Sequence, residues 1–485
     1  MTRNAITDRY LDMIARRGVA ADEIPAAVRS AADLHPTTFK GTCLSRPAFL
    51  DAGERERLEE DLGRLYTAVA SLPDRLFGGD LAAFARAAGM TDTQVTAIMR
   101  GHTSTPSRLA RGDIYHDGTN FRLMELNMGS TVGGLDNAVV NRAALTHPVL
   151  AEFVEAEGLA YVDTMKELAG MLLAESGVEP GARGVPDGPG ARGVPDGSGE
   201  RPLIAAVDWP ASFATLEPQL HASAAMLAEL GVEVVPCHLG QLDHRDGRLW
   251  LDGRAVDVVY RIWMIEDLLQ PGGPELIDPV LRAVERGQVA IFTPMDTELY
   301  GSKAALAMLS DEANRHLHTA QELASLDRLL PWTRMVRDGA VTVDGETVDM
   351  LEYALGRRED LVLKPTMMHG SQGVVMGWLV DEDAWATQLR AAVDGPYVLQ
   401  RRIQPAAEPF PADGGADDGA GGGAGDGAGD GLAAMRLAWC VFQVSSGFGG
   451  ALVRGSTRSD GGLMDHAAGA QLGCCFHEQG RQASA

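Results

Sequence analysis

The sequence predicts a mixed α/β protein, and three observations support this fold class. Between about residues 202 and 292, short apolar runs alternate with a helical pattern, which is typical of a parallel sheet. Residues 111–128 have the pattern of two strands joined by a turn at 117–120. Residues 361–365 form an apolar run that includes Lys364, which predicts a buried strand ending in a cation.

Composition narrows the class of protein. A chain of 485 residues, 45% of them hydrophobic, predicts roughly three domain-sized units with large cores. No apolar run reaches the roughly 20 residues that cross a bilayer, and the first ten residues do not resemble a signal peptide. The formal net charge of −25 disfavours nucleic acid and anionic membranes as partners. Five cysteines without metal-type spacing fit reduced thiols, so we expect a cytoplasmic protein.

The chain divides into regions of different pattern. Residues 1–105 are expected to be helical, with Asp51 as an N-cap and Glu54 completing a capping box, and we assign them a supporting role. Residues 106–150 contain the hairpin. Residues 151–200 combine helices with a Gly/Pro-rich linker, in which the eight residues 181–188 recur at 190–197. A segment of this composition predicts a flexible surface insertion.

The second half begins with a Rossmann-like unit at 201–295. Its expected strands are 203–207, 232–235, 255–260 and 289–292, and a helix is expected at 219–230. It lacks G-x-G-x-x-G after the first strand, so it is not a dinucleotide site. Residues 296–478 form the last unit, interrupted by a Gly/Ala/Asp insertion at 412–431 that we expect to be disordered.

The hairpin carries a candidate metal site. Residues two apart on a strand share a face, so Arg111 pairs with Asp113 and Glu125 with Asn127. All four share one face only if the turn has an odd number of residues, which predicts a three-residue loop at 117–119 with Asp113 opposite Leu123 and diagonal to Glu125. The oxygen donors suit Mg²⁺, which is usually held by one or two carboxylates and phosphate oxygens. The glycine-rich residues 129–134 allow backbone amides to approach an anion. A solvated polar face is the alternative interpretation.

Two lysines form a second constellation. Lys364 ends the buried strand, where a cation needs a partner such as a phosphate. The following loop, with Gly370, Ser371 and Gly373, offers backbone amides to the same phosphate, although no Walker A motif is present. Lys303 follows Ser302, a natural N-cap, so we expect it at a helix N-terminus. Solvated surface lysines are the alternative.

The order of these motifs resembles that in the circularly permuted branch of the ATP-grasp ligases. There the metal-binding residues precede the nucleotide lysine, as Arg111-x-Asp113 and Glu125-x-Asn127 precede Lys303 and Lys364 here. The strand at 397–403 resembles the family's interdomain strand that reads adenine. The resemblance implies a permuted ATP-grasp fold. Its parts are a metal-binding part at 106–150, a pre-ATP-grasp domain at 201–295 and a nucleotide-binding part at 296–478.

The resemblance also implies a set of site residues. Two arginines are implied in catalysis: Arg111, for the oxyanion of the tetrahedral step, and Arg454, for phosphate or the substrate carboxylate. Two Mg²⁺ ions, with Mn²⁺ as an alternative, are implied at Asp113, Glu125 and Asn127. The implied ATP-binding residues are Lys303, Lys364, Gly370, Ser371, Gln372, Gly373, Gln400, Ile403 and Glu408. Glu408 is expected at the ribose, and Gln400 stands where the family usually has glutamate.

The function implied is that of an ADP-forming carboxylate–amine ligase. It would join a small carboxylic acid to an amine through an acyl phosphate, in the manner of glutathionylspermidine synthase-like or peptide ligase-like members, in natural-product metabolism. Three alternatives stay open: loading of an acid onto a carrier-protein thiol, phosphoryl transfer to a hydroxyl, and ATP binding without catalysis. A homodimer is also left open. The sequence does not predict the acid, the acceptor or the pathway.

Overall fold

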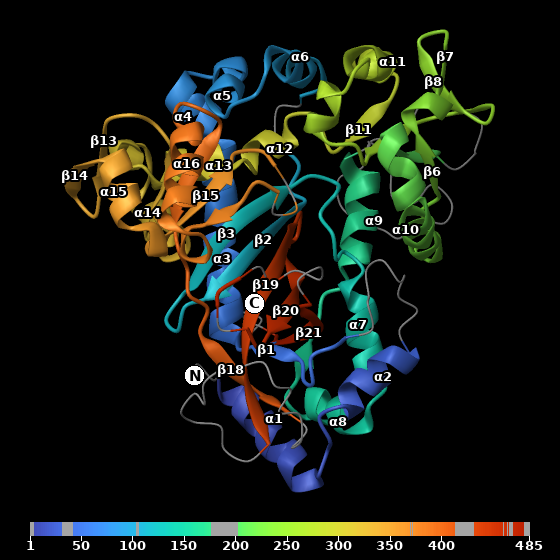
Figure 1. The fold of residues 1–485 in the computed structure, drawn as a ribbon. Coiled ribbons are helices and arrows are strands. Elements are labelled where there is room, and N and C mark those ends of the chain that lie inside the picture. The colour runs from blue at the N-terminus through green and yellow to red at the C-terminus, as the bar shows by residue number, and fades with distance from the viewer. Residues whose placement is uncertain are drawn as a thin grey trace.

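The computed structural model of the chain is a mixed α/β protein built around a large main sheet (Figure 1). It describes residues 4–31, 42–102, 106–175, 202–368, 370, 372–412, 431–458, 460–462, 464 and 469–479. The duplicated Gly/Pro segment, Ser371, and the 412–431 insertion apart from its two end residues lie outside these ranges. The predictions made for them are therefore untested.

The main sheet has the strand order β1-β21-β20-β19-β2-β3, with β18 also paired to β19 and β4 to β21. Neighbouring strands run antiparallel, except that β1 and β21 are parallel. The bounds are β1 Ala48–Leu50, β2 Ala110–His116, β3 Phe121–Met128, β4 Leu159–Ala160, β18 Ala407–Pro411, β19 Leu432–Val444, β20 Gly447–Ser456 and β21 Gln471–Glu478.

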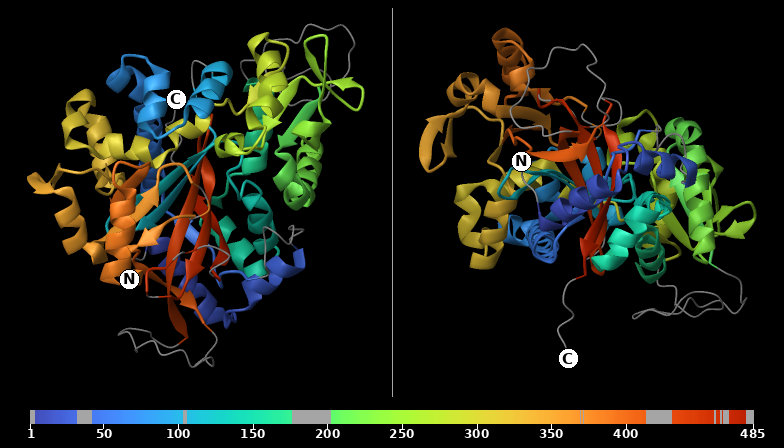
Figure 2. Two further views of the ribbon diagram at one scale, coloured as in Figure 1. Left: turned by 45° about the horizontal axis from the view of Figure 1, so that its top comes forward. Right: turned by 90° about the horizontal axis from the view of Figure 1, so that it is seen from below.

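The centre of this sheet joins segments that are distant in the sequence. Strand β2 lies between β3 and β19, with Arg111 opposite Phe442 and Asp113 opposite Cys440. Figures 1 and 2 show the teal β2–β3 hairpin beside the red strands β19 and β20. Residues 106–150 therefore share a sheet with the last unit of the chain.

The hairpin places Arg111, Asp113, Glu125 and Asn127 on one face, as predicted, but its turn differs from the predicted turn. Its loop has four residues, because His116 pairs with Phe121, so the three-residue turn was wrong. A bulge compensates: Ile114 pairs with Leu123, but Asp113 pairs with Glu125, which leaves Met124 as an extra residue in β3. Because of the bulge, the side chains of the two strands share a face in the same way as they would with a turn of an odd number of residues.

A second, parallel sheet confirms the predicted βαβ unit. Its order is β11-β10-β5-β6, and all three pairings are parallel. Helix α10 begins at Pro210, nine residues before the predicted start, because Pro210 occupies the first turn and Pro218 is accommodated inside the helix. The bounds in this unit are β5 Ile204–Asp208, α10 Pro210–Glu229, β6 Val234–His238, β7 Asp243–Arg245, β8 Arg248–Leu251, β9 Arg254–Ala255, β10 Val258–Arg261, α11 Gly273–Glu285 and β11 Ala290–Phe292.

The orange lobe on the left of Figure 1 has a sheet of its own, in the order β12-β17-β15-β16. Its separate apolar core includes Trp332, Trp385 and Leu363. The bounds are α12 Thr297–Tyr300, α13 Lys303–Ser310, α14 Ala320–Leu329, β12 Thr333–Met335, β13 Ala340–Val343, β14 Glu346–Asp349, α15 Met350–Gly356, β15 Leu361–Pro365, β16 Val375–Met376, α16 Glu382–Ala392 and β17 Tyr397–Arg401.

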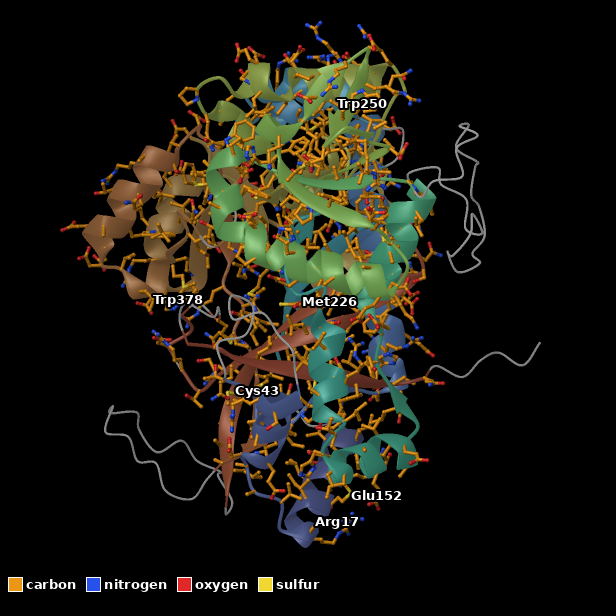
Figure 3. All side chains as sticks on the ribbon, turned by 90° about the vertical axis from the view of Figure 1, so that its right-hand side faces the viewer. Arg17, Cys43, Glu152, Met226, Trp250 and Trp378 are labelled. Atoms are coloured by element: carbon orange, nitrogen blue, oxygen red, sulfur yellow. The ribbon has the colours of Figure 1, made fainter. Side chains whose placement is uncertain are left out.

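The remaining helices pack around the main sheet and its neighbours. They are α1 Ala5–Arg17, α2 Glu23–Ala31, α3 Ala52–Ala70, α4 Leu72–Phe77, α5 Leu81–Ala87, α6 Asp92–Gly101, α7 Asn137–Ala144, α8 Pro148–Ala156 and α9 Thr164–Glu175. Helix α3 contacts β1, β19, β20 and β21, whereas α6 contacts α11. The capping box of Asp51 and Glu54 is present at the start of α3. The N-terminal region is not purely helical, because β1 pairs with β21. At the foot of Figure 3, Arg17 of α1 and Glu152 of α8 form an ion pair of 2.6 Å.

Among the described residues, no helix is both long enough and apolar enough to span a bilayer.

One buried arginine ties β1 to β18. The side chain of Arg46 donates to the carbonyls of Pro409 and Pro47 and to Glu408 Oε2 (2.9 Å), and its guanidinium lies 3.8 Å from the centre of the Phe410 ring. The Arg46 side chain is fully buried and that of Glu408 is 15% exposed. This pair therefore forms in a place where an unpartnered charge is costly.

We expect Arg46→Ala to lower the free energy of unfolding by about 3–5 kcal/mol, because Glu408 would lose the guanidinium that pairs with it. Urea denaturation followed by tryptophan fluorescence measures the change. Arg9→Ala is the control, since the exposed pair of Arg9 with Glu157 should contribute about 1 kcal/mol or less. Equal losses in both variants would contradict the prediction.

Candidate active site

A cavity of about 300 Å³ lies between the main sheet and the lobe, and most of the predicted site residues line it. The lining comes from β2, β3, β19 and β20, from the loop after β3, from α13, and from β15 to β17. The predicted residues found there are Arg111, Asp113, Glu125, Asn127, Lys303, Lys364, Gly370, Gln400, Ile403 and Arg454. Segments more than 300 residues apart in the chain therefore meet in one cavity.

Asp113 is held between two arginines. Arg111 donates to both of its carboxylate oxygens, from Nε to Oδ1 at 2.7 Å and from Nη2 to Oδ2 at 2.9 Å. Arg454 Nη2 donates to Oδ2 at 3.2 Å from β20. Arg111 Nη1 also donates to the carbonyl of Gly133 at 2.9 Å, in the glycine-rich loop after β3. A guanidinium has five N–H donors, so Arg111 keeps two for a bound group.

Lys303 lies where its position in the sequence predicted. The side chain of Ser302 caps α13 by accepting from the Ala305 N–H, so Lys303 is the first residue of that helix. Its backbone N–H donates to the Thr366 carbonyl, and its Nζ donates to the Met368 carbonyl at 3.1 Å. The same Nζ lies 3.6 Å from Glu125 Oε2. The ammonium therefore links the lobe to the metal-type residues of β3.

Lys364 is a buried cation with polar partners. Its Nζ donates to Gln400 Oε1 at 2.6 Å and to the Met124 carbonyl at 3.1 Å. Burial lowers the pKa of Lys364 to about 8, and Glu125 offsets only part of that effect. The Gln400 side-chain oxygen, expected at adenine, is thus occupied by Lys364.

Glu125 stays ionised in this environment. Burial alone would raise its pKa, but the charges of Lys303 and Lys364 outweigh burial and lower the pKa to about 2. Asn127 Nδ2 donates to Glu125 Oε1 at 3.3 Å, so the two predicted neighbours on β3 do interact.

The loop at 370–373, which was predicted to bind phosphate, lines the cavity only in part. Gly370 lines the cavity and has a positive φ of 61°. Gln372 and Gly373 are described but do not line it, and the Cβ of a residue in place of Gly373 would lie 3.2 Å from Pro365 Cγ. Ser371 lies outside the described residues.

The structure does not bring Glu408, the residue expected at the ribose, together with the other predicted site residues. It lies on β18, does not line the cavity, and forms the ion pair with Arg46 described above. The structure therefore gives Glu408 a partner outside the cavity, and its ribose role stays a prediction. The pairing partner lies 362 residues away in the sequence, which explains why local pattern could not reveal it.

The donor set fits Mg²⁺ at Glu125 and Asn127 better than at Asp113. Glu125 offers an ionised carboxylate and Asn127 an amide oxygen on the same face, which are ligands that Mg²⁺ accepts. Both oxygens of Asp113 are already bonded to guanidinium groups, so it becomes a ligand only if an arginine releases it. Within the described ranges, no three His, Cys, Asp or Glu side chains form a metal-type cluster.

The cavity is positive although the chain is strongly negative. Of the lining residues that the structure describes, five are cationic and two are acidic. Arg401 is paired outward with Asp344, which leaves Arg111, Arg454, Lys303 and Lys364 around the two carboxylates. A cleft with this balance concentrates anions.

Several lining residues were missed by sequence reasoning. Tyr115 follows Arg111 and Asp113 at the same two-residue spacing and could have been found from it. Six methionines also line the cavity: Met124 and Met128 from β3, and Met264, Met368, Met376 and Met464 from other segments. With Trp378, they give part of the cavity an apolar, adaptable surface.

Comparison with known proteins identifies the fold. No protein-family model matches this sequence, and a search of curated proteins finds no match. Among solved structures, the chain is similar to a glutathione synthetase-like effector from Globodera pallida, solved in its apo form. The TM-score is 0.52, the identity is 12%, and the match covers 94% of this chain and 96% of that chain. The protein therefore has a mixed α/β fold like that of a glutathione synthetase-like protein.

We expect binding of tripolyphosphate to weaken as the pH rises between about 7 and 9. Loss of the Lys364 proton, whose pKa is about 8, removes one positive charge from the cavity. Calorimetric titration at several pH values measures the effect. Lys364→Met should bind more weakly and lose this pH dependence, whereas Lys166→Met, at an exposed position on α9, should behave like the parent protein. An unchanged pH profile in Lys364→Met would refute the assignment.

Proposed function

We propose that the protein is an ATP-dependent carboxylate–amine ligase that forms an amide bond through an acyl phosphate and releases ADP and phosphate. One observation carries the proposal: Lys303, Lys364, Arg111 and Arg454 surround Glu125 and Asp113 in a single cavity. That arrangement suits a polyphosphate together with a carboxylate. The similarity to a glutathione synthetase-like fold supports a ligase of the ATP-grasp kind, and the chain order of the motifs supports the permuted branch.

In this proposal, each cation has a part in the reaction. Lys303 and Lys364, both on the lobe side, hold the phosphates of ATP. Arg111 and Arg454, on the main sheet, hold the carboxylate of the acid. Glu125 and Asn127 would hold Mg²⁺, with Asp113 joining them if Arg111 or Arg454 releases it. When bound, the metal neutralises charge that develops on the phosphates.

The chemistry then follows from the substrates. A carboxylate oxygen attacks the γ-phosphorus, and the bond to the bridging oxygen breaks as ADP leaves. The amine nitrogen attacks the acyl carbon, and the tetrahedral intermediate places negative charge on the former carbonyl oxygen. The two free N–H donors of Arg111 stabilise that oxygen. The C–O bond to phosphate breaks, and the phosphate leaves with the proton that the amine gives up.

The experiment that tests this function is a trapping assay. The protein is incubated with Mg-ATP, hydroxylamine and pooled carboxylic acids, and the products are analysed by mass spectrometry. ADP with a new hydroxamate is expected, because hydroxylamine intercepts an acyl phosphate. AMP with a hydroxamate would instead indicate an adenylate, and a stable phosphoester would indicate transfer to a hydroxyl. Glu125→Gln, which removes only the charge, should abolish ADP release.

Arg111→Ala should reduce turnover by about 10²–10³-fold while ATP binding stays nearly intact, since the arginine acts on the tetrahedral step. Steady-state ADP release and equilibrium ATP binding are measured on the same preparation. Arg111→Lys keeps the charge but loses the two-point contact with Asp113, so it should recover little of the rate. Arg458→Ala, at an exposed arginine beyond the end of β20, is the control. Parallel losses of binding and turnover in Arg111→Ala would exclude the role.

A further inference from the structure

A second cavity of about 270 Å³ adjoins the candidate active site and has no role in the mechanism above. It lies between α9, α10, the parallel sheet and the segment 130–136. Figure 3 shows α10, labelled at Met226, lying across the side of the molecule that faces the viewer. The lining residues are Ser130, Thr131, Val132, Gly133, Gly134, Leu135, Asp136, Met165, Leu168, Ala206, Leu216, Gln219, Leu220, Ser223, Ala224, Leu227, Val234, Tyr260 and Ile262.

The walls of this second cavity are mainly aliphatic. Leu168, Leu227 and Met165 are almost fully buried around it. Leu216 and Leu220, one helical turn apart on α10, are half-buried: they line the cavity and also pack against the buried apolar cluster beside it. The space is therefore suited to an apolar group from outside the chain.

The two cavities share an edge. Thr131, Val132 and Gly133 line both of them, and Thr131 and Gly133 are exposed. The carbonyl of Gly133 accepts from Arg111 Nη1 at 2.9 Å. A group bound to Arg111 thus lies against the same backbone that borders the second cavity. Gly133 has no side chain to obstruct the shared edge.

Charge sets the orientation of a ligand that spans both cavities. Among the described residues that line the second cavity, Asp136 is the only charged one, whereas cations surround the first. A carboxylate is therefore favoured beside Arg111 and disfavoured beside Asp136. The apolar remainder of the same molecule is favoured among the leucines.

We propose that the second cavity receives the apolar chain of the acid substrate, so that the preferred acid is a monocarboxylate with an extended aliphatic chain. This inference rests on the proposed function, because it takes the acid to bind at Arg111. The amine would then reach the acyl carbon from the open side of the first cavity. The proposal names a substrate class that the motifs themselves do not specify.

A chain-length series tests the proposal. Straight-chain acids from propionate to decanoate are compared with dicarboxylates of equal length, by KM in the ADP-release assay with hydroxylamine and by calorimetric binding without ATP. Each added methylene should lower KM and Kd about fourfold until the cavity is filled, since burial of a methylene contributes that factor. The dicarboxylates should gain nothing with length.

Variants on α10 locate the effect. Ala224→Phe fills the second cavity without reaching the first, so it should abolish the gain with chain length and leave propionate unchanged. Ala225→Phe adds the same side chain at the next, exposed position and should behave like the parent protein. If Ala224→Phe does not fold, judged by circular dichroism, Ser223→Phe at a half-buried lining position provides the same test.

The outcomes separate this inference from the proposed function. ADP and hydroxamate formed equally from short and long acids would overturn the substrate class and leave the ligase activity standing. Chain-length-dependent binding that Ala224→Phe removes, with no ADP release, would support the cavity and overturn the activity. A chain-length gain that persists unchanged in both α10 lining variants would place the chain elsewhere and refute the proposal.

Discussion

Pairing between β2 and β19 is the contact on which the candidate site depends. It places residues 110–115 against residues 438–443, and the bulge at Met124 then sets Glu125 and Asn127 on the face that carries Arg111 and Asp113. A shift by one residue in β2 or in β3 would turn the two groups on that strand to the opposite face. The geometry of the site is therefore a property of strand register, which backbone hydrogen bonds fix before any ligand binds.

The electrostatics of the cavity explain why a negative protein can hold a negative ligand. Four cations surround two carboxylates, and Lys364 is buried deeply enough that its pKa falls to about 8. Such an arrangement is costly when empty and is relieved by an anion. Asp113 accepts hydrogen bonds from two of these cations, Arg111 and Arg454. The same carboxylate thus acts as an internal substitute for a bound anion, which explains why it suits Mg²⁺ less well than Glu125.

Local pattern was sufficient for part of this site. The alternation Arg111, Asp113 and Glu125, Asn127, the Ser302 cap and the strand ending at Lys364 are short-range signals, and each is present where it was predicted. The bulge was not predicted, because a turn with an odd number of residues would place the same side chains on one face. The Arg46 partner of Glu408, the methionines of the lining and the second cavity depend on contacts between distant segments, which no single stretch of sequence encodes. The domain boundaries, the metal and the ATP contacts stay predictions.

The length of the connection between β18 and β19 does not set the geometry of the site. Ala412 N–H donates to the Gly431 carbonyl at 2.9 Å, so the two strands are already paired where residues 413–430 leave and return. Closing a longer loop costs only about 0.6 kcal/mol for each doubling of its length. That junction is therefore a natural place to shorten the chain or to insert a foreign domain, because β18 already pairs with β19 over residues 432–436, before β19 reaches the cavity at Ala438.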